Sequence, residues 1–306
     1  MAEIVVLGSL NMDLVVRTAH IPRPGETVSG EGFVTIPGGK GANQAAAAAR
    51  LGASVAMVGR VGADAFGPAL LANLRAQGVD VTHVRHDPAA PSGIALIAIA
   101  ADGENAIIVA PGANGRVGHE DLEAAADVIA QARLLVMQFE IPLDTVRAAL
   151  AMARARGLPV ILNPAPAQAV EAEFFHGVHY LVVNETEAEQ LAGLAVSDLA
   201  AAERAGRALL ARGVPVVIVT LGAQGALLVT ADQATHVPAR KVAVVDTTAA
   251  GDAFLGGLAA ALLRGFALPE AVRYATCAGT LATTVLGAQT SLPTAAQVLA
   301  FFEGRA

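Results

Sequence analysis

Cysteine and tryptophan are scarce in this chain: among its 306 residues there is one cysteine, Cys277, and no tryptophan. A single cysteine cannot form a disulfide within the chain or a metal site built from several thiolates. Disulfide-dependent secreted folds are therefore excluded, and a reducing compartment is the natural expectation. Because the first residues also lack the basic segment and long apolar core of a secretory signal, we expect a cytoplasmic protein.

Positive charge is also in short supply, since 20 Lys and Arg stand against 27 Asp and Glu and give a net charge of -7. Nucleic-acid phosphates need clustered basic side chains, so nucleic acid is not an expected partner. Long apolar runs are missing as well. The uncharged segment between Arg273 and Glu303 is interrupted by Gly287 and Pro293 before it reaches the roughly 18 apolar residues that a membrane helix requires. We expect buried helices there and no membrane partner.

Apolar sequence is abundant, at 54% of the residues, and it comes as short β-rich runs that alternate with alanine-rich or amphipathic helical segments. Parallel strands joined by helices on both faces of a sheet produce this alternation. The sequence therefore predicts an α/β fold with three α/β/α layers and a mostly parallel central sheet. The expected strands include the apolar runs at 3–8, 55–62, 134–139, 158–164, 180–184 and 214–222.

Two regions interrupt the alternation, at about 12–37 and 92–110. Both have polar–apolar alternation and turn residues without helical segments, and Asp102-Gly103 marks a hairpin in the second. We expect these strands to form a small antiparallel β lid beside the main sheet. No linker, charge block or internal repeat divides the chain, so residues 1–306 are expected to form one domain that carries the lid strands as insertions.

The common glycine-rich phosphate loops are absent. Lys40 is followed by Gly41, where a Walker A loop has Ser or Thr, and the first strand leads into GSLNMD instead of a GxGxxG turn. A nucleotide would therefore need another binding arrangement.

The stretch VVDTTAAGDAFLGGLAAALL, at 244–263, offers such an arrangement because it predicts a helix that begins behind very small residues. Amides in a first helical turn lack intrahelical partners and lie at the positive end of the helix dipole, so they bind anions. Ala249, Ala250 and Gly251 would let a bulky anion approach, and Asp252 would stand beside it as a general base for phosphoryl transfer. An acid in a first helical turn is also a common stabilising choice, worth about 0.3–1 kcal/mol, so the residues alone leave both interpretations open.

Two other motifs near strand ends carry polar side chains. In GGKGANQA, from Gly38, the glycines permit close approach of a ligand while Lys40 and Asn43 offer donors to hydroxyl or phosphate oxygens. In NMD, Asn11 and Asp13 suit a pair of adjacent hydroxyls, because Asp13 accepts hydrogen bonds and Asn11 can both donate and accept. A simple turn explains either motif equally well.

Three further residues or motifs fall at the same expected edge of the sheet. Glu140 follows the strand at 134–139 and is placed to orient a hydroxyl or a neighbouring lysine. Asn184 and Glu187 form a capping box that structure alone explains, with a contribution to Mg²⁺-bound water or phosphate as a second role. The segment TLGAQGALLV, from Thr220, predicts a strand, a tight turn and a strand against which a nucleotide can lie.

Taken together, these motifs resemble the ribokinase branch of the carbohydrate kinase superfamily, which also includes adenosine kinases and minor phosphofructokinases. The resemblance rests on GSLNMD, GGKGANQA, NPAPA, NETEAE, VDTTAAGDAF and GAQTS, which occur in the family's order and cover essentially the whole chain. It implies a ribokinase-like fold, ATP as phosphoryl donor, Mg²⁺ as cofactor and K⁺ as activator. With this resemblance, the capping box at Asn184 is better read as having both roles.

The resemblance also implies roles for individual residues. Asp252 matches the catalytic base, and its neighbours Ala249, Ala250 and Gly251 match the anion hole. The sugar-binding positions are Asn11, Asp13, Gly39, Lys40, Asn43, Glu140 and Asp252. The nucleotide-binding positions are Asn184, Glu187, Thr220, Gly222, Gly225, Gly251 and Thr276. The monovalent-cation positions are Asp246, Thr248, Ala282, Val285, Gly287 and Ser291.

Two positions depart from the wider superfamily: Ala249 replaces a common glycine, and Thr276 stands where others have His or Asn near adenine. The expected activity is ATP-dependent phosphorylation of D-ribose at O5. The alternatives are a nucleoside or deoxyribose kinase that uses the same phosphate machinery, and a non-catalytic sugar sensor, against which Asp252 argues. Exposed lid edges predict a homodimer formed through the lid strands.

Overall fold

The structure, a computed structural model, describes residues 2–305 and contains a nine-stranded main sheet. Its strand order is β13-β12-β11-β10-β9-β8-β1-β4-β5. The strands from β11 to β5 in this order are parallel, whereas β12 and β13 join antiparallel. The strand bounds are β1 Ile4–Leu7, β4 Val55–Gly62, β5 Val79–Asp87, β8 Leu134–Gln138, β9 Val160–Asn163, β10 Tyr180–Asn184, β11 Val216–Thr220, β12 Ala226–Thr230 and β13 Ala234–Val237.

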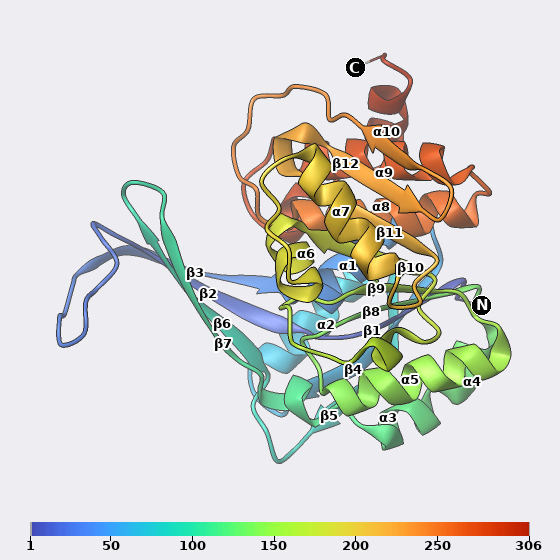
Figure 1. Cartoon of the computed structure of the whole chain (residues 1–306). Coiled ribbons are helices and arrows are strands. Elements are labelled where there is room, and N and C mark those ends of the chain that lie inside the picture. Colours follow the sequence, from blue (N-terminus) through green and yellow to red (C-terminus); the bar gives the residue numbers. More distant parts are fainter. Residues whose placement is uncertain (1, 306) are drawn as a thin grey trace.

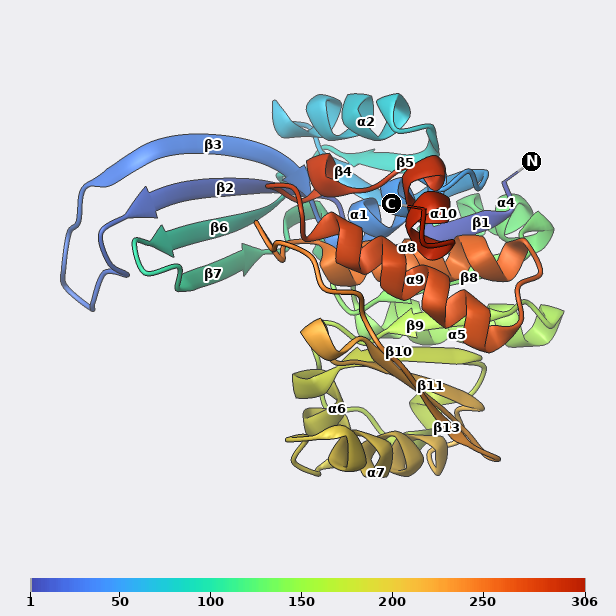
Figure 2. The same ribbon diagram turned by 90° about the horizontal axis from the view of Figure 1, so that it is seen from above.

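Helices cover both faces of this sheet, as Figures 1 and 2 show. One face packs against α1 Lys40–Arg50, α2 Phe66–Ala76, α8 Ala250–Leu263, α9 Leu268–Ala282 and α10 Ala295–Phe302. The other packs against α3 His119–Ala124, α4 Ala126–Gln131, α5 Leu143–Arg156, α6 Glu185–Ala192 and α7 Leu199–Leu210. Short 3₁₀ helices occur at η1 Gly112–Arg116, η2 Ala172–Phe175, η3 Gly222–Gln224 and η4 Gln289–Ser291. The expected three-layer α/β/α fold is confirmed.

Strand β1 illustrates how the sequence produces two cores. Its side chains alternate between the faces of the sheet, so Ile4 and Val6 enter one core while Val5 and Leu7 enter the other. All four are fully buried, as expected for a central parallel strand with helices on both sides. Strand β1 lies inside the sheet between β8 and β4, so its carboxyl end opens between the ends of two parallel neighbours.

Small residues let helices α1 and α8 approach closely. A Cβ atom on Gly256 would come within 2.4 Å of the Ala47 Cβ atom, so only glycine fits at this crossing. The alanines of both helices are buried in the same core. Alanine-rich helices thus reflect tight packing in this protein, and within residues 2–305 no helix is long and apolar enough to span a bilayer.

The lid is a separate four-stranded sheet that projects from the carboxyl side of the main sheet (Figure 1). Its strands are β2 Asn11–Thr18, β3 Gly30–Gly38, β6 Gly93–Ala100 and β7 Asn105–Ala110, which match the two regions expected from the sequence except that the first extends by one residue at each end. Both hairpins are antiparallel, β2 with β3 and β6 with β7, and Gly103 adopts a positive φ of 91° at the expected turn. The hairpins are joined by a parallel pairing of β2 with β6, which the local pattern does not predict.

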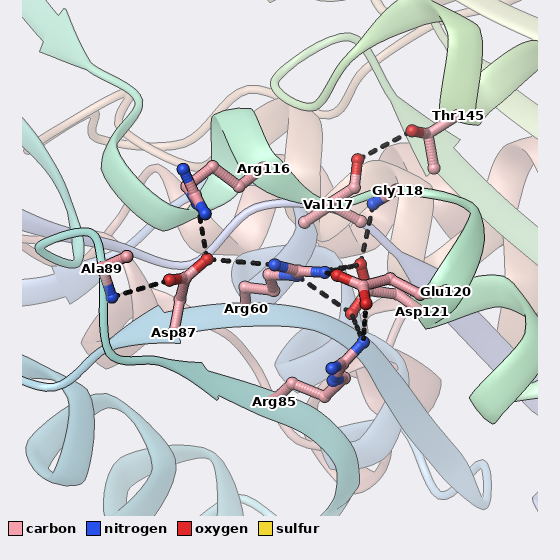
Figure 3. A network of polar contacts seen from close by, with 10 residues as sticks. All are labelled: Arg60, Arg85, Asp87, Ala89, Arg116, Val117, Gly118, Glu120, Asp121 and Thr145. Carbon is pink, nitrogen blue, oxygen red and sulfur yellow. Dashed lines mark hydrogen bonds and ion pairs between the residues drawn. The ribbon is translucent and has the colours of Figure 1, made fainter.

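A buried ion cluster fixes the chain that leads into β6 (Figure 3). Arg60 on β4 is 6% exposed and donates to Asp87 at 3.0 Å and to Asp121, while Glu120 also contacts its guanidinium. Arg116 donates to the same Asp87 oxygen at 2.7 Å. The amide of Ala89 and the guanidinium groups of Arg116 and Arg60 outweigh burial and lower the pKa of Asp87 to about 2.

The last residue before β6 is held just as firmly. Ser92 donates to Asp64 through both its amide, at 2.7 Å, and its hydroxyl, at 2.8 Å. Asp64 also caps the start of α2 by accepting from the amides of Phe66 and Gly67. The second hairpin of the lid therefore starts from a rigid root on the main body.

Candidate active site

The functional side chains lie at the carboxyl edge of the main sheet, because parallel neighbouring strands all end there. Strand β1 leads to Ser9, β8 to Glu140, β9 ends at Asn163 and β10 at Asn184. The amino ends of α1 and α8 meet the same edge, since both helices pack on one face next to β1 and β8. The expected site residues therefore come from segments far apart in the sequence.

Asp252 lies in the first turn of α8 and is only 8% exposed. Its Oδ1 atom accepts from Nε2 of Gln44 at 2.9 Å, and its Oδ2 atom accepts from Nδ2 of Asn43 at 3.0 Å. Burial raises the pKa of Asp252, although the ammonium of Lys40 and the two amide donors oppose this shift. A carboxylate with a raised pKa and two fixed donors has the properties of a general base.

The start of α8 is shaped by Ala249, which adopts the left-handed region with a φ of 58° although it is not glycine. The first helical bond runs from the amide of Ala253 to the carbonyl of Ala249 at 2.8 Å. The amide of Ala250 instead donates to Thr247 within the loop, at 3.2 Å. A Cβ atom on Gly251 would meet no atom within 4 Å, so the helix end is open to a bulky anion at Gly251.

Asn11 starts β2 and is oriented by Asn114, a residue for which the sequence analysis predicted no role. Nδ2 of Asn114 donates to Oδ1 of Asn11 at 2.7 Å. The same Nδ2 group donates to the carbonyl of Leu10 at 3.0 Å, and Oδ1 of Asn114 accepts from the amide of Leu10 at 2.9 Å. The oxygen of the Asn11 amide is therefore engaged, and its Nδ2 group is left to donate to a ligand. This fixes the hydrogen-bonding sense that the sequence left open.

Asp13 follows two residues later on β2 and faces a group of charged side chains. Burial, together with the carboxylates of Glu140 and Asp252, raises the pKa of Asp13 to about 7 against the opposing effect of Lys40. The free protein therefore holds Asp13 partly protonated near neutral pH. A partner that donates a hydroxyl hydrogen bond to its carboxylate would favour the charged form.

Lys40 is the cation of this group. Burial disfavours its charged form, but the carboxylates of Asp252, Glu140, Glu187 and Asp13 outweigh that effect and raise the pKa of Lys40. Its backbone amide donates to Oε2 of Glu140 at 3.1 Å, so Glu140 contacts this lysine through the main chain.

The backbone beside Lys40 is closely fitted to the first lid strand. Gly39 has a φ of 91°, and a Cβ atom there would lie 2.7 Å from the amide nitrogen of Asn11. The hydroxyl of Ser9 donates to Oε2 of Glu140, the atom that also accepts from the Lys40 amide, at 2.5 Å. The glycines of this motif therefore serve close packing between the lid root and α1.

A cavity of about 700 Å³ opens next to Gly251 and extends along the ends of β10 and β11. Six of the seven residues expected at a nucleotide line it: Asn184, Thr220, Gly222, Gly225, Gly251 and Thr276. Further lining residues that the sequence analysis did not identify include Lys241, Val242, Thr247, Phe254 and Thr280. Lys241 follows the last strand in a segment without regular structure, which gave no local signal.

Glu187 is the one expected nucleotide residue that does not line this cavity. It closes the capping box with Asn184, in which the amide of Glu187 donates to Oδ1 of Asn184 at 2.8 Å and the amide of Asn184 donates to Oε2 of Glu187 at 3.0 Å. Burial raises the pKa of Glu187, against the opposing effects of the Asn184 amide and Lys40. The hydroxyl of Thr276 also turns away, since it donates to the carbonyl of Val272 within α9 at 2.8 Å.

The residues expected at a monovalent cation lie in two segments that Asp246 joins: the loop before α8, and the stretch from the end of α9 to η4. Its Oδ1 atom accepts from the amide and hydroxyl of Thr248, at 2.9 and 2.7 Å, and its Oδ2 atom accepts from the amide of Gly287 at 2.8 Å. These donors outweigh burial and lower the pKa of Asp246, so it stays anionic. Thr283 braces the second segment by accepting from the amides of Val245 and Asp246.

A buried carboxylate at an open helix start, between a charged polar group of side chains and a large cavity, is the kind of site that transfers a phosphoryl group to an alcohol. The family model for the pfkB family of carbohydrate kinases matches residues 1–295. This chain belongs to that family.

Individual relatives are similar over nearly their whole length. A ribokinase from Haemophilus influenzae is 39% identical over 97% of both chains, and a deoxyribokinase from Salmonella typhi is 38% identical over 96% of this chain and 97% of its own. Among solved structures, an Arabidopsis thaliana ribokinase complexed with ribose and ATP superposes with a TM-score of 0.91, at 33% identity and 99% coverage of both chains.

The raised pKa of Asp13 predicts a stability cost at neutral and alkaline pH. The folded pKa lies above the unfolded value of 3.8, so the cost is absent below about pH 4, grows as pH rises and is complete above about pH 7. Asp13→Asn should therefore raise the free energy of unfolding by about 1–4 kcal/mol at pH 8 and by less at pH 5.

Urea unfolding of both proteins at the two pH values measures this difference. Asp232→Asn, at an exposed turn aspartate, is the matched control and should change neither value. A loss of stability in Asp13→Asn at pH 8 would contradict the assigned cost.

Proposed function

We propose that this protein phosphorylates D-ribose at O5 with ATP, producing ribose 5-phosphate and ADP. The observation that carries the proposal is the position of Asp252, in the first turn of α8, between the charged group around Asp13 and the large cavity next to Gly251. The family membership and the ribokinase relatives support the same activity.

The proposed chemistry is a direct transfer. The O5 hydroxyl attacks the γ-phosphorus, its proton passes to a carboxylate oxygen of Asp252, and the bond from phosphorus to the leaving ADP oxygen breaks. Gly251 and its neighbours Ala249 and Ala250 form the anion hole, where the positive end of α8 stabilises charge on the transferred group. Lys40 adds positive charge on the sugar side.

Sugar recognition is assigned to Asn11 and Asp13, with Gly39, Lys40, Asn43 and Glu140 completing the site. An amide that donates, next to a carboxylate that accepts, suits two adjacent hydroxyls, which ribose has at C2 and C3. A kinase acting on deoxyribose is the second candidate, since a deoxyribokinase is among the relatives. Nucleosides are a further alternative, while a sensor without catalysis would have no use for a buried carboxylate at the helix start.

ATP is assigned to the 700 Å³ cavity, and the lid is proposed to close over the sugar and exclude water from the reaction. Within residues 2–305 no cluster of three or more acidic, His or Cys side chains could bind a metal ion. We assign Mg²⁺ to the carboxylate of Glu187 beside Asn184, because this ion is commonly held by phosphates and water with only one or two protein carboxylates. The ion would neutralise charge on the phosphates.

We assign a K⁺ site to the two segments joined by Asp246. A carboxylate that remains anionic there, together with nearby backbone carbonyls, is a suitable donor set for a monovalent cation. The residues assigned are Asp246, Thr248, Ala282, Val285, Gly287 and Ser291. Because the first of these segments leads directly into α8, a bound cation would brace the anion hole.

A second copy of the chain is the proposed protein partner. Large apolar side chains on the lid are exposed: Phe33, Val34, Leu96, Ile107, Ile108 and Val109. Strands β3 and β7 form the two open edges of the lid sheet, and an apolar sheet of this kind can pair with an identical one about a twofold axis. We propose a cytoplasmic homodimer that binds neither nucleic acid nor membrane.

The test of the activity is release of ADP from ATP and Mg²⁺ with ribose, deoxyribose, fructose, adenosine and uridine as acceptors. Ribose should give the highest kcat/KM. In Asp252→Asn, kcat should fall by about 100-fold or more, because the base is lost, while calorimetry still detects ribose binding. Near-normal turnover would refute the role of Asp252, and a preference for deoxyribose would favour the second candidate.

The cation site predicts a specific dependence on K⁺. Activity in buffer free of sodium and potassium should be low and should recover when KCl is added, because the cation stabilises the loop before α8. Tetramethylammonium chloride at equal ionic strength is the control. Asp246→Ala should respond to neither salt, and a wild-type protein indifferent to KCl would argue against the site.

The lid surface predicts that the dimer depends on its apolar side chains. Ile108→Glu, at a residue that is 67% exposed, should shift the mass measured by light scattering from dimer to monomer, because a buried unpaired charge opposes association. Leu194→Glu, at an exposed leucine outside the lid, should leave the mass unchanged. A monomeric wild-type protein would overturn the proposal.

A further inference from the structure

Two lines of side-chain amides converge on the carboxylate of Asp252, and all of these amides are buried except that of Asn73, which is half-buried. Within the first line, Nε2 of Gln138 donates to Oε1 of Gln44 at 2.6 Å, and Nε2 of Gln44 donates to Oδ1 of Asp252 at 2.9 Å. None of these three side chains is more than 8% exposed. The two glutamines come from β8 and α1, which are in contact with each other.

The second line reaches the other carboxylate oxygen. Nδ2 of Asn73 donates to Oε1 of Gln289 at 2.5 Å, and Nε2 of Gln289 donates to Oδ1 of Asn43 at 3.1 Å. Nδ2 of Asn43 then donates to Oδ2 of Asp252 at 3.0 Å. Every amide in both lines donates in the direction of the carboxylate, so each bond polarises the next in the same sense.

The first line leaves one buried oxygen without a partner. Oε1 of Gln138 has no hydrogen bond within residues 2–305, although Gln138 is 0% exposed. The opposite orientation of this amide would bring its oxygen against Oε1 of Gln44 and remove the donor. An unsatisfied buried carbonyl is rare. In this protein it results from the orientation in which Gln138 donates to Gln44, and Gln44 in turn donates to Asp252.

The charges around Asp252 explain why donors are needed. The charged groups that face it are Asp13 on β2, Lys40 on α1, Glu140 after β8 and Glu187 on α6. Three of the four are carboxylates, which repel a further negative charge, and burial adds to that effect. The fixed dipoles of the amides oppose both the repulsion by these carboxylates and the effect of burial.

We propose that Gln44, supported by Gln138, and Gln289, acting through Asn43, are positioning residues that hold Asp252 ionised and correctly oriented for proton transfer. The proposal rests on the kinase activity proposed above. Neither Gln44 nor Gln289 is assigned a contact with the sugar or with the transferred phosphoryl group. Both act through the base, as preorganised dipoles that are in place before the substrates bind.

Gln44 also connects the base with the nucleotide side. Its Nε2 group lies 3.3 Å from Oδ1 of Asn163, whose Nδ2 group lies 3.4 Å from Oε2 of Glu187. Asn163 additionally donates to the carbonyl of Val182 at 3.1 Å. The amide of Gln44 is thus fully used, and its orientation is set from both sides.

Gln44→Met tests the first line, because methionine keeps the length of the side chain and removes both the donor and the acceptor. We expect kcat to fall by about 10- to 100-fold, while the Kd for ribose stays within about twofold. With a donor lost, the carboxyl is harder to ionise, so the acid limb of the kcat–pH profile moves to higher pH. Gln77→Met, at a glutamine that bonds Arg50 far from the site, is the matched control and should keep the wild-type profile.

A double-mutant cycle distinguishes positioning from a general loss of structure. In an Asp252→Asn background, Gln44→Met should lower kcat no further, because the base on which it acts is gone. An equal drop in both backgrounds would overturn the proposal, as would a wild-type pH profile in Gln44→Met. If that variant does not fold, Gln289→Met decides by the same measurements. A wild-type protein that phosphorylates no sugar would instead refute the proposed function.

Discussion

The proposed site depends on keeping the carboxylate of Asp252 ionised in a buried environment that disfavours its negative charge. Asp252 is buried beside the positive end of the α8 dipole, which we assign to the transferred phosphoryl group, and other carboxylates lie nearby. A protonated Asp252 could not accept the hydrogen of an alcohol. Lys40 and the amides of Asn43 and Gln44 provide the compensating field, and each is supplied by α1. In the proposed mechanism, the close packing of α1 against α8 is therefore a chemical requirement as well as a structural one.

The residues that we assign to sugar binding also belong to the lid. Asn11 and Asp13 are among the first residues of β2, which runs from the end of β1 into the lid. Any tilt of the lid thus moves the groups assigned to the sugar, so binding energy and closure are linked. The other hairpin starts from the rigid root at Asp64 and Ser92, which confines movement to the strands beyond it.

The concentration of carboxylates around Lys40 lowers stability in return for chemistry. The raised pKa of Asp13 means that its ionised carboxylate is less stable in the folded protein than in water. Two fully buried cores, built from alternating strand residues and alanine-rich helices, supply the compensating apolar burial. A stable α/β framework around an electrostatically strained centre is a common arrangement in enzymes.

The sequence by itself determined the features that depend on neighbouring residues: the strand and helix alternation, the turn at Asp102-Gly103, the capping box at Asn184 and a helix starting near Asp252. Each of these rests on backbone bonds or side-chain caps a few residues apart. Ordered motifs also indicated the family. Only the tertiary structure decided the parallel pairing of β2 with β6, the orientation of Asn11 by Asn114 and the amide lines that meet at Asp252. Their partners lie up to 246 residues apart, so their contacts depend on how the whole sheet and its helices assemble, which no local pattern encodes.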